Sequence, residues 1–300
     1  MKIGIDLGGS HVAVGLINDD LELIEKIEEN LSKEEKQNLS YALIANIENK
    51  ITQILEQTHI GIEQIEQIGI ACPGTIKEGH IYKASNLGLK DFPMQEKLQE
   101  IFPSTLIKIR NDAKCAALAE MKKGSLKGCQ DAVFLGLGTG IGGAVFLKGQ
   151  LLESTHFSAF EIGHMIIEKD GLQCTCGKKG CFEKYGSMKA LKDTIRSKYG
   201  LGEDVHSREL MEILSNGSKK SEKILEEYLE MLKIGIGNLI DLFEPEIICF
   251  GGSFAYYEEL FMPRLQEKLK EPKLTFNERT DIKLTVATLQ NNAGIIGAIC

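Results

Sequence analysis

The chain of 300 residues contains no tryptophan, no cluster of basic residues and no long apolar run. The missing tryptophan excludes no class of function by itself. Because no apolar run is long enough to cross a bilayer, we expect no membrane-spanning helix. The N-terminus, MKIGIDLGG, also lacks the basic and apolar blocks of a signal peptide. These absences favour a cytoplasmic protein without a membrane partner.

A net charge of −8 argues against nucleic acid as a partner. Proteins that bind nucleic acid through its phosphates carry basic patches, whereas this chain has a pI of about 5.4. The 43% apolar composition over 300 residues allows a large buried core and favours two domains or one large one.

The cysteines fall into two groups. At Cys72, Cys115, Cys129 and Cys249, with Cys300 at the terminus, they stand singly, and we expect small core side chains rather than disulfides. The remaining three lie within the stretch 157–187, which reads FSAFEIGHMIIEKDGLQCTCGKKGCFEKYGS.

Three thiols and one imidazole in this stretch make a complete tetrahedral set for a structural Zn²⁺ ion. The ligands would be His164, Cys174, Cys176 and Cys181. Glycines between them would let the loop fold back on itself. The alternative is a loop of unpaired cysteines with a surface histidine, but cytosolic chains rarely cluster cysteines without metal or redox chemistry.

Two acidic residues, Glu161 and Glu183, lie at the ends of the same stretch. A metal ion that cross-links the loop would hold their carboxylates at a fixed separation. Carboxylates held in this way suit a ligand with several hydroxyl groups.

Two segments about half a chain apart share the pattern strand, glycine-rich turn, strand. The first is KIGIDLGGSHVAVGLIN at 2–18, and the second is DAVFLGLGTGIGGAVFLKG at 131–149. The backbone N–H groups of a tight glycine turn can approach a phosphate closely. One such hairpin is commonplace, but its repetition predicts two related lobes that face each other across a cleft.

The segments around these hairpins alternate between helix and strand patterns. We expect helices at 39–57, from about 94, after 112, and at 187–199, 204–216, 219–243 and 292–300, and strands at 67–71, 106–109, 246–250 and 282–287. The charged stretch 26–38 is expected to be solvated surface, and 84–87 a loop. A third glycine turn, Gly251-Gly252-Ser253, follows a strand and opens a helix, which suits the approach of a nucleotide.

Asn111 and Asp112 lie where the strand 106–109 meets the next helix. Ligands of α/β sheets bind at the carboxyl ends of strands, so both residues are candidates for a site. The alternative for Asp112 is a helix N-cap, which its position alone favours.

Along its whole length the chain resembles the ROK family of sugar kinases and sugar-responsive repressors. The matching motifs are DLGGS at 6–10, GIACPG at 69–74, SNL at 85–87, NDA at 111–113, GLGTGIGGA at 136–144, EIGH at 161–164, the cysteine loop CxCGxxGCxE, EPEIICFGG at 244–252 and AGIIGA at 293–298. The resemblance implies an α/β, two-lobed, actin-like (ribonuclease H-like) ATPase fold with a central cleft. The small lobe would comprise 1–115, with the C-terminal helix of about 289–300 packing back on it, and the large lobe, 116–288, would contain the zinc loop.

The resemblance also implies roles for individual residues. Asp112 would be the catalytic base, and Asp6 would hold Mg²⁺ through water. The sugar would be bound by Asn86, Asn111, Asp112, Glu161, His164 and Glu183. ATP would be bound by Asp6, Gly8, Gly9, Ser10, His11, Gly138, Thr139, Gly140, Gly142, Gly143, Gly251 and Gly252. His164 would bind Zn²⁺ with one ring nitrogen and a sugar hydroxyl with the other.

Four positions depart from the family's usual residues. Ser10 replaces a threonine, His11 a lysine and Lys114 an asparagine. Phe160 stands where a glycine commonly precedes EIGH, and its ring could narrow the sugar pocket or reshape the loop. The changes at Ser10 and His11 are tolerable in a turn that works mainly through its backbone, and we expect Phe160 to affect the choice of substrate more than the reaction.

The resulting hypothesis is the ATP-dependent phosphorylation of a hexose, with glucose as the first choice. Fructose, N-acetylmannosamine and N-acetylglucosamine are alternative substrates. A non-catalytic, sugar-responsive regulator is an alternative of another class, although repressor members carry an additional N-terminal helix-turn-helix domain and this chain begins at the first strand. A filament-forming or chaperone ATPase would have no use for the sugar-site acids and the zinc loop. Family members usually form homodimers or homotetramers.

Overall fold

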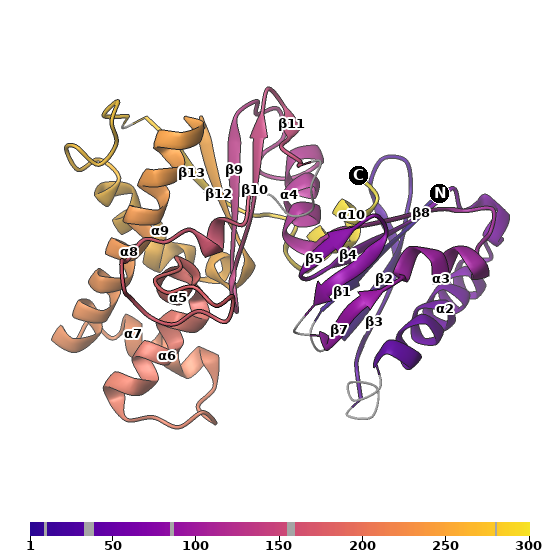
Figure 1. Ribbon diagram of the computed structural model, residues 1–300, viewed down its shortest axis with the longest axis horizontal. Coiled ribbons are helices and arrows are strands. Elements are labelled where there is room, and N and C mark those ends of the chain that lie inside the picture. The colour runs from indigo at the N-terminus through magenta and orange to yellow at the C-terminus, as the bar shows by residue number, and fades with distance from the viewer. Residues whose placement is uncertain (9–10, 33–38, 85–86, 155–159, 280) are drawn as a thin grey trace. The chain divides into compact units, whose positions relative to one another are not determined.

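The computed structural model describes residues 1–8, 11–32, 39–84, 87–154, 160–279 and 281–300 (Figure 1). The chain divides into two compact units. The first comprises Met1–Lys127, Glu153–Ala159 and Thr288–Cys300, and the second comprises Gly128–Leu152 and Phe160–Ala287. The sequence-based boundary at residue 115 falls inside helix α4 (Asp112–Lys122), which the first unit contains whole.

The first unit is built on a five-stranded sheet with the strand order β3-β2-β1-β4-β8. β2 is antiparallel to β1 and β3, β4 is parallel to β1, and β8 is parallel to β4. A separate antiparallel sheet has the order β5-β6-β7. The elements are β1 (Lys2–Leu7), β2 (His11–Ile17), β3 (Leu23–Asn30), α2 (Leu39–Thr58), η1 (Ile62–Gln64), β4 (Gln67–Cys72), β5 (Thr75–Lys77), β6 (His80–Ala84), β7 (Leu89–Phe92), α3 (Met94–Ile101), β8 (Leu106–Asn111), α4, η5 (Gln290–Asn292) and α10 (Ala293–Ala298).

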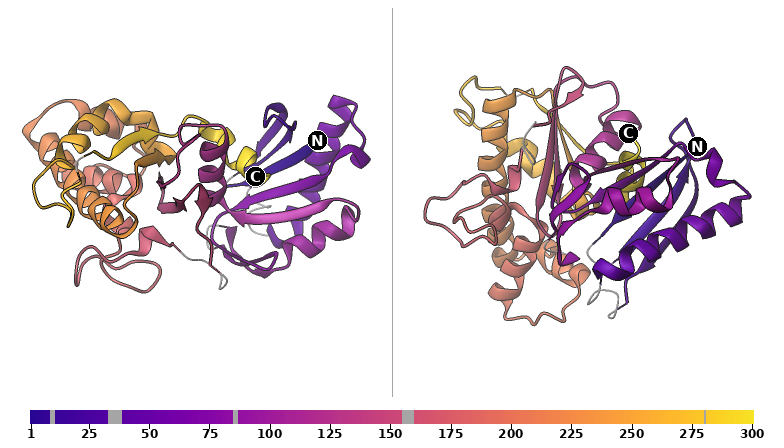
Figure 2. Two further views of the ribbon diagram at one scale, coloured as in Figure 1. Left: turned by 90° about the horizontal axis from the view of Figure 1, so that it is seen from above. Right: turned by 45° about the vertical axis from the view of Figure 1, so that its right-hand side comes forward.

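Helices cover both faces of this sheet, which explains why most of β1 and all of β4 are buried (Figure 2). α2 and α3 pack on the sheet from one side, while α10 lies on β1 and β4. Gly4 and Gly69 are paired across these two strands. A Cβ on Gly4 would collide with the Ile295 carbonyl oxygen, and one on Gly69 would collide with that of Ala298. The two glycines therefore let the C-terminal helix lie directly on the N-terminal strands.

The second unit is built on a five-stranded sheet with the order β11-β10-β9-β12-β13. β10 is antiparallel to β9 and β11, β12 is parallel to β9, and β13 is parallel to β12. The elements are β9 (Ala132–Leu137), β10 (Ile141–Leu147), β11 (Gln150–Leu151), η3 (Ile162–His164), α5 (Glu183–Gly186), α6 (Met188–Tyr199), α7 (Ser207–Ser215), α8 (Lys219–Phe243), β12 (Ile247–Gly251), η4 (Gly252–Tyr257), α9 (Glu258–Lys268) and β13 (Lys283–Val286).

The two five-stranded sheets repeat one pattern. In each, a hairpin is extended by an antiparallel strand on one side and by two parallel strands on the other. The hairpins are β1–β2 and β9–β10, the two segments whose sequences share a glycine-rich turn. The repeated hairpin in the sequence therefore marks the repetition of a whole sheet.

Aromatic side chains fill part of the core of the second unit. Phe254 stacks on Phe261 with 4.7 Å between ring centroids, and Phe250 lies 5.0 Å from Phe254. All three side chains are fully buried between β12, η4 and α9. Offset aromatic contacts at such distances add to the free energy of burial, so the segment that follows β12 is firmly seated.

The expected helices lie close to their predicted bounds, since apolar periodicity and capping residues agree. Ser187 and Ser218 accept hydrogen bonds from backbone N–H groups of the first turns of α6 and α8. The charged stretch 26–38 begins with the end of an edge strand, β3, and the last residues of this strand face solvent. The region after residue 72, where a turn and a loop were expected, contains the small sheet β5-β6-β7. The third glycine turn leads first into η4 and then into α9. Within the described part of the chain, no helix is both long enough and apolar enough to span a membrane.

Candidate functional site

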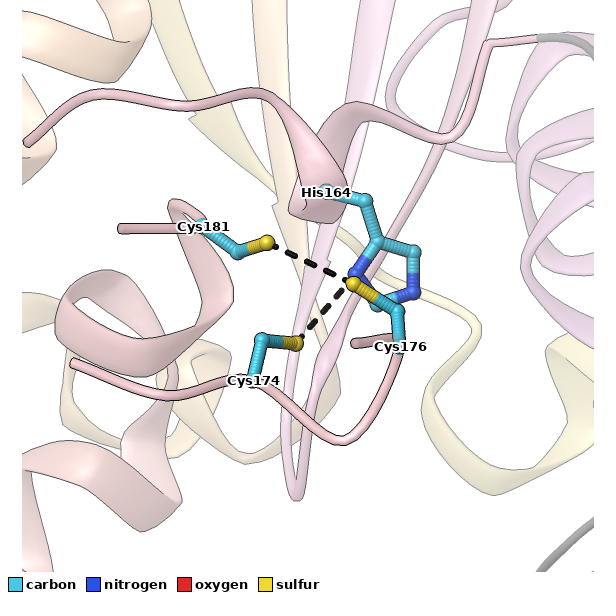
Figure 3. Close-up of side chains that lie close together, drawn as sticks. All are labelled: His164, Cys174, Cys176 and Cys181. Carbon is cyan, nitrogen blue, oxygen red and sulfur yellow. Dashed lines mark hydrogen bonds between the residues drawn. The ribbon is translucent and has the colours of Figure 1, made fainter. Parts of the chain in front are cut away.

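Three cysteines and one histidine converge in the second unit (Figure 3). The ligand atoms of His164, Cys174, Cys176 and Cys181 all lie within 4.8 Å of one another. Cys174 Sγ is 3.7 Å from His164 Nδ1, and Cys176 Sγ is 3.6 Å from Cys181 Sγ.

These separations fit a tetrahedral Zn²⁺ ion. Bonds of about 2.3 Å to sulfur and about 2.1 Å to nitrogen place two sulfur atoms about 3.8 Å apart, and a sulfur and a nitrogen about 3.6 Å apart. Burial and the neighbouring thiols raise the pKa of Cys181 to about 12. A bound cation would therefore be needed to keep this thiol deprotonated at neutral pH. The donor set and its spacing agree with the predicted structural zinc site.

The loop that carries the cysteines is held by its own backbone. Cys174 N–H donates to the Lys178 carbonyl at 2.8 Å, and Phe182 N–H donates to the Met165 carbonyl at 2.8 Å. Isolated β-bridges join Ile166 to Cys181 and Gln173 to Lys179. The fold of the loop thus brings the end of η3, where His164 lies, next to the start of α5.

The glycine turn between β9 and β10 is braced by the elements on either side of the cysteine loop. Ile141 N–H donates to Glu183 Oε2 at 3.1 Å, and a Cβ on Gly140 would overlap the Glu183 carboxylate. On the other side, Gly163 in η3 lies so close to the Ile141 carbonyl that a Cβ would not fit. The turn that contains Gly138, Thr139, Gly140, Gly142 and Gly143 is therefore packed against η3 and α5.

The third glycine turn lies beside the second. Gly251 pairs with Gly136 at the ends of β12 and β9. Gly252 has φ of 69°, and a Cβ there would lie 2.7 Å from the Leu137 carbonyl oxygen. Only glycine adopts this conformation so close to another backbone without strain. Gly251 and Gly252 thus adjoin the start of the turn at residue 138.

Glu161 and Phe160 precede η3. Glu161 is exposed, and its carbonyl accepts a hydrogen bond from His164 N–H at 2.9 Å. Phe160 has φ of 62°, a left-handed conformation that strains a bulky side chain. Its ring lies 6.1 Å from that of Phe243 in an edge-on arrangement. The structure therefore gives a backbone reason for the glycine commonly found at this position, and it directs the Phe160 ring against Phe243.

In the first unit, Asn111 and Asp112 lie at the carboxyl end of β8. Asn111 is the N-cap of α4, because its Oδ1 accepts from Ala113 N–H at 3.0 Å and Lys114 N–H at 3.3 Å. Its Nδ2 donates to the Gly74 carbonyl at 3.1 Å. Asp112 takes the first helical position, where its Oδ1 accepts from Ala113 N–H at 2.8 Å. The capping alternative considered for Asp112 therefore applies to Asn111.

Asp6, near the carboxyl end of β1, interacts electrostatically with Asp112 in the same unit. Burial and, to a smaller extent, the Asp112 charge raise the pKa of Asp6 to about 7, and the Lys26 charge opposes them. Burial and the same two carboxylates also raise the pKa of Cys72. A pair of carboxylates in partly buried surroundings favours a cation between or beside them. Asp6 and Asp112 thus have the chemistry expected for a Mg²⁺-dependent site.

The first glycine turn is described only in part, since Gly9 and Ser10, like Asn86, lie outside the described residues. Gly8 N–H donates to the His11 carbonyl at 2.9 Å, which closes the β1–β2 hairpin. A Cβ on Gly8 would overlap the His11 imidazole. His11 is the first residue of β2.

Sequence patterns did not predict two of these relationships. The hydrogen bond between Ile141 N–H and Glu183 joins residues that are 42 positions apart in the sequence, and no local sequence pattern predicts it. Asn and Asp are both common N-cap residues, so residue type alone does not show whether Asn111 or Asp112 caps α4. The order NDA alone does not decide which residue ends the strand.

Comparisons with known proteins agree with this architecture. The model of the ROK family matches residues 2–300. The chain is 28% identical to the glucokinase of Halalkalibacterium halodurans, over 98% of this chain and 92% of that protein. It is 27% identical to the xylose repressor of Caldicellulosiruptor bescii, over 99% of this chain and 76% of that protein.

A solved structure shows the same fold. The ROK family glucokinase from Streptomyces griseus, in complex with glucose and AMPPNP, matches with a TM-score of 0.80. The match covers 99% of this chain and 97% of that chain at 23% identity. This likeness and the mixed α/β sheets confirm the expected actin-like ATPase fold. With a family model that spans almost its full length, the chain belongs to the ROK family.

Proposed function

We propose that this protein is a sugar kinase that transfers the γ-phosphoryl group of ATP to a hexose hydroxyl, with glucose as the first candidate. The observation that carries the proposal is the arrangement of Asn111 and Asp112. Because Asn111 caps α4, the carboxylate at the first helical position is the one suited to chemistry. The similarity to glucokinases supports the same conclusion.

Asp112 is the general base. Its carboxylate accepts the proton of the sugar hydroxyl as the hydroxyl oxygen attacks the γ-phosphorus of ATP. A new P–O bond to the sugar forms while the bond between the γ-phosphorus and the bridging oxygen breaks, and ADP leaves. The proton remains on Asp112 until solvent removes it.

Backbone N–H groups of the glycine turns hold the phosphates, and their fixed dipoles oppose the charge of the phosphate oxygens. Mg²⁺, where bound, would supply additional positive charge to those oxygens. Asp6 would hold this ion through water. The raised pKa of Asp6 supports this role, since burial and the Asp112 charge disfavour its ionised form and a bound cation would favour it.

The sugar contacts follow from the groups that remain available. Glu183 uses Oε2 for Ile141 N–H, which leaves Oε1 for a hydroxyl. His164 directs Nδ1 toward Cys174, so that Nε2 is the nitrogen for a hydroxyl. Asn111 uses Oδ1 for the helix cap, and its amide can donate to a sugar oxygen. Glu161 and Asn86 complete the proposed set.

Zn²⁺ has a structural part in this proposal. It would tie His164 in η3 to Cys181, two residues before Glu183. Both elements brace the glycine turn at 138–143. The ion would therefore hold His164, Glu183 and the proposed phosphate-binding turn in one rigid arrangement within the second unit.

A sugar-responsive regulator is the alternative, because a xylose repressor is also similar to this chain. A coupled assay of ADP release over glucose, fructose, mannose, N-acetylmannosamine and N-acetylglucosamine separates the two. A kinase turns over at least one sugar and loses that turnover in Asp112→Asn. A regulator binds a sugar in calorimetry without ATP consumption, and that result would reject the kinase. We also propose a homodimer or homotetramer, which light scattering tests.

A further inference from the structure

Glu120, near the end of α4, is fully buried and has no part in the proposed chemistry. Its Oε2 accepts from Ser125 N–H at 2.7 Å, Ser125 Oγ at 3.1 Å and Thr288 Oγ1 at 3.1 Å. Its Oε1 accepts from Leu289 N–H at 2.8 Å. Buried carboxylates are rare unless every oxygen is satisfied in this way.

The partners of Glu120 lie beside two passages of the chain between the units. The chain leaves the first unit between Lys127 and Gly128, and it returns between Ala287 and Thr288. Ser125 precedes the first passage, and Thr288 and Leu289 follow the second. One carboxylate therefore binds the first-unit ends of two connections that are 160 residues apart in sequence.

The same helix carries the proposed base at its other end. α4 begins at Asp112 and ends at Lys122. It is packed closely on α10, where Gly297 lies so near the Cys115 carbonyl that a Cβ would not fit. Ala119, Ala293 and Ile296 form a buried contact between the two helices. A helix seated in this way is rigid, so the position of Glu120 is fixed relative to Asp112.

We propose that Glu120 is a positioning residue that fixes two of the connections between the units to the helix that begins with the base. With both connections bound at α4, these two of the passages between the units leave the first unit from points that are fixed relative to Asp112. Small misplacements of reacting groups cost much of the rate of a reaction, so a looser attachment of the two connections should slow the proposed phosphoryl transfer. This inference rests on the proposed function for its consequence in catalysis, but not for its mechanical part.

Glu120→Gln tests the inference because the amide keeps the size of the side chain while one acceptor becomes a donor that faces other donors. Glu153→Gln is the control. Glu153 is an exposed acid that follows another passage of the chain and pairs with Arg110 at 3.4 Å. Thr288→Val removes one donor from the same carboxylate and serves if Glu120→Gln does not fold.

Three measurements on the full chain give the expected pattern. Hydrogen exchange of the Ser125 and Leu289 amides should speed up at least about tenfold in Glu120→Gln. Fluorophores attached by non-cysteine chemistry at the exposed residues Glu63 and Glu212, one in each unit, should report a broader distance distribution. The kcat should fall about tenfold while the sugar Kd stays within a few-fold. Glu153→Gln should leave all three at wild-type values.

An unchanged distance distribution in a folded variant would overturn the inference even if the two amides exchange faster, because Glu120 would then have a local structural role alone. If the wild type phosphorylates no sugar, the proposed function fails, while the exchange and distance measurements still decide the mechanical claim.

Discussion

The backbone N–H of Ile141 donates a hydrogen bond to Glu183 Oε2 across 3.1 Å. This bond joins the glycine turn that opens β10 to the residue that opens α5. Glu183 follows Cys181 by two residues, so the cysteine loop, the Glu183 side chain and the glycine turn are directly connected. A change in the metal site should therefore reach the proposed phosphate-binding turn.

Zinc content gives the first prediction. Protein purified without added metal should contain one Zn²⁺ per chain by elemental analysis, since four ligand atoms are already gathered. Cys176→Ser should lower the metal content, the midpoint of thermal unfolding and the sugar affinity together. Cys129→Ser, outside the cluster, should change none of these. A metal-free preparation with full stability and activity would rule out the zinc site.

Glu183 and Glu161 should differ in their effects on the two substrates. Glu183→Ala removes a proposed sugar contact and the acceptor of Ile141 N–H, so the KM for the sugar and the KM for ATP should both rise, each by about 10- to 100-fold. Glu161 is exposed, and within the described part of the chain it has no such bond to the turn. Glu161→Ala should therefore raise the KM for the sugar alone. An equal rise in the KM for ATP in the two variants would refute the coupling through Ile141.

Replacing Phe160 with alanine and with glycine should show, through the unfolding free energy, that the backbone at this position is strained. Phe160→Ala loses the contact with Phe243 and keeps the left-handed conformation, which should cost about 1–3 kcal/mol of unfolding free energy. Phe160→Gly loses the same contact but relieves the conformation, so it should be about 1 kcal/mol more stable than Phe160→Ala in urea unfolding. The reverse order would mean that the backbone at residue 160 is unstrained. The sugar panel with Phe160→Gly tests the predicted effect on substrate choice.

The electrostatics of Asp6 predict a pH dependence. Its pKa is raised by burial and Asp112 to about 7, whereas an unfolded aspartate titrates near pH 3.9. Between about pH 4 and pH 7 the folded protein keeps a proton that the unfolded chain has released, so this carboxyl makes stability fall as pH rises. Above pH 7, the free energy of unfolding is lower by up to about 4 kcal/mol than it would be with an unshifted carboxyl.

Urea unfolding without added Mg²⁺ checks this dependence. Asp6→Asn should match the wild type at pH 4 and exceed it in stability increasingly up to about pH 7. Asp112→Asn should weaken the dependence, because the Asp112 charge contributes to the shift. A constant difference between Asp6→Asn and wild type across this range would contradict the raised pKa.

Much of the fold could be predicted from the sequence, since local signals and tertiary structure agree. The repeated hairpins have apolar strands and glycine turns, and Ser187 and Ser218 mark the helices that follow them. β3 was missed because LIEKIEEN is an edge strand whose charges face solvent, and such charges equally suit a surface loop.

The candidate site was less predictable where it depends on contacts distant in sequence. The cysteine loop is local, and its ligands could be recognised from residue types and spacing. The sequence around Glu120 is that of an ordinary helical glutamate. Its burial depends on Ser125, Thr288 and Leu289, and the last two are distant in the sequence. The direction of the Phe160 ring likewise depends on Phe243, 83 residues later.

The central claim is that Asp112 is the general base, and Asp112→Asn tests it most directly. Because Asn111 caps α4, the variant should keep the fold and the wild-type sugar Kd, with a thermal midpoint no lower than that of the wild type. Loss of a positioned base should lower kcat by about 10²–10⁴-fold in the coupled assay of ADP release. A kcat within a few-fold of the wild type, in a folded variant with unchanged sugar affinity, would contradict the account.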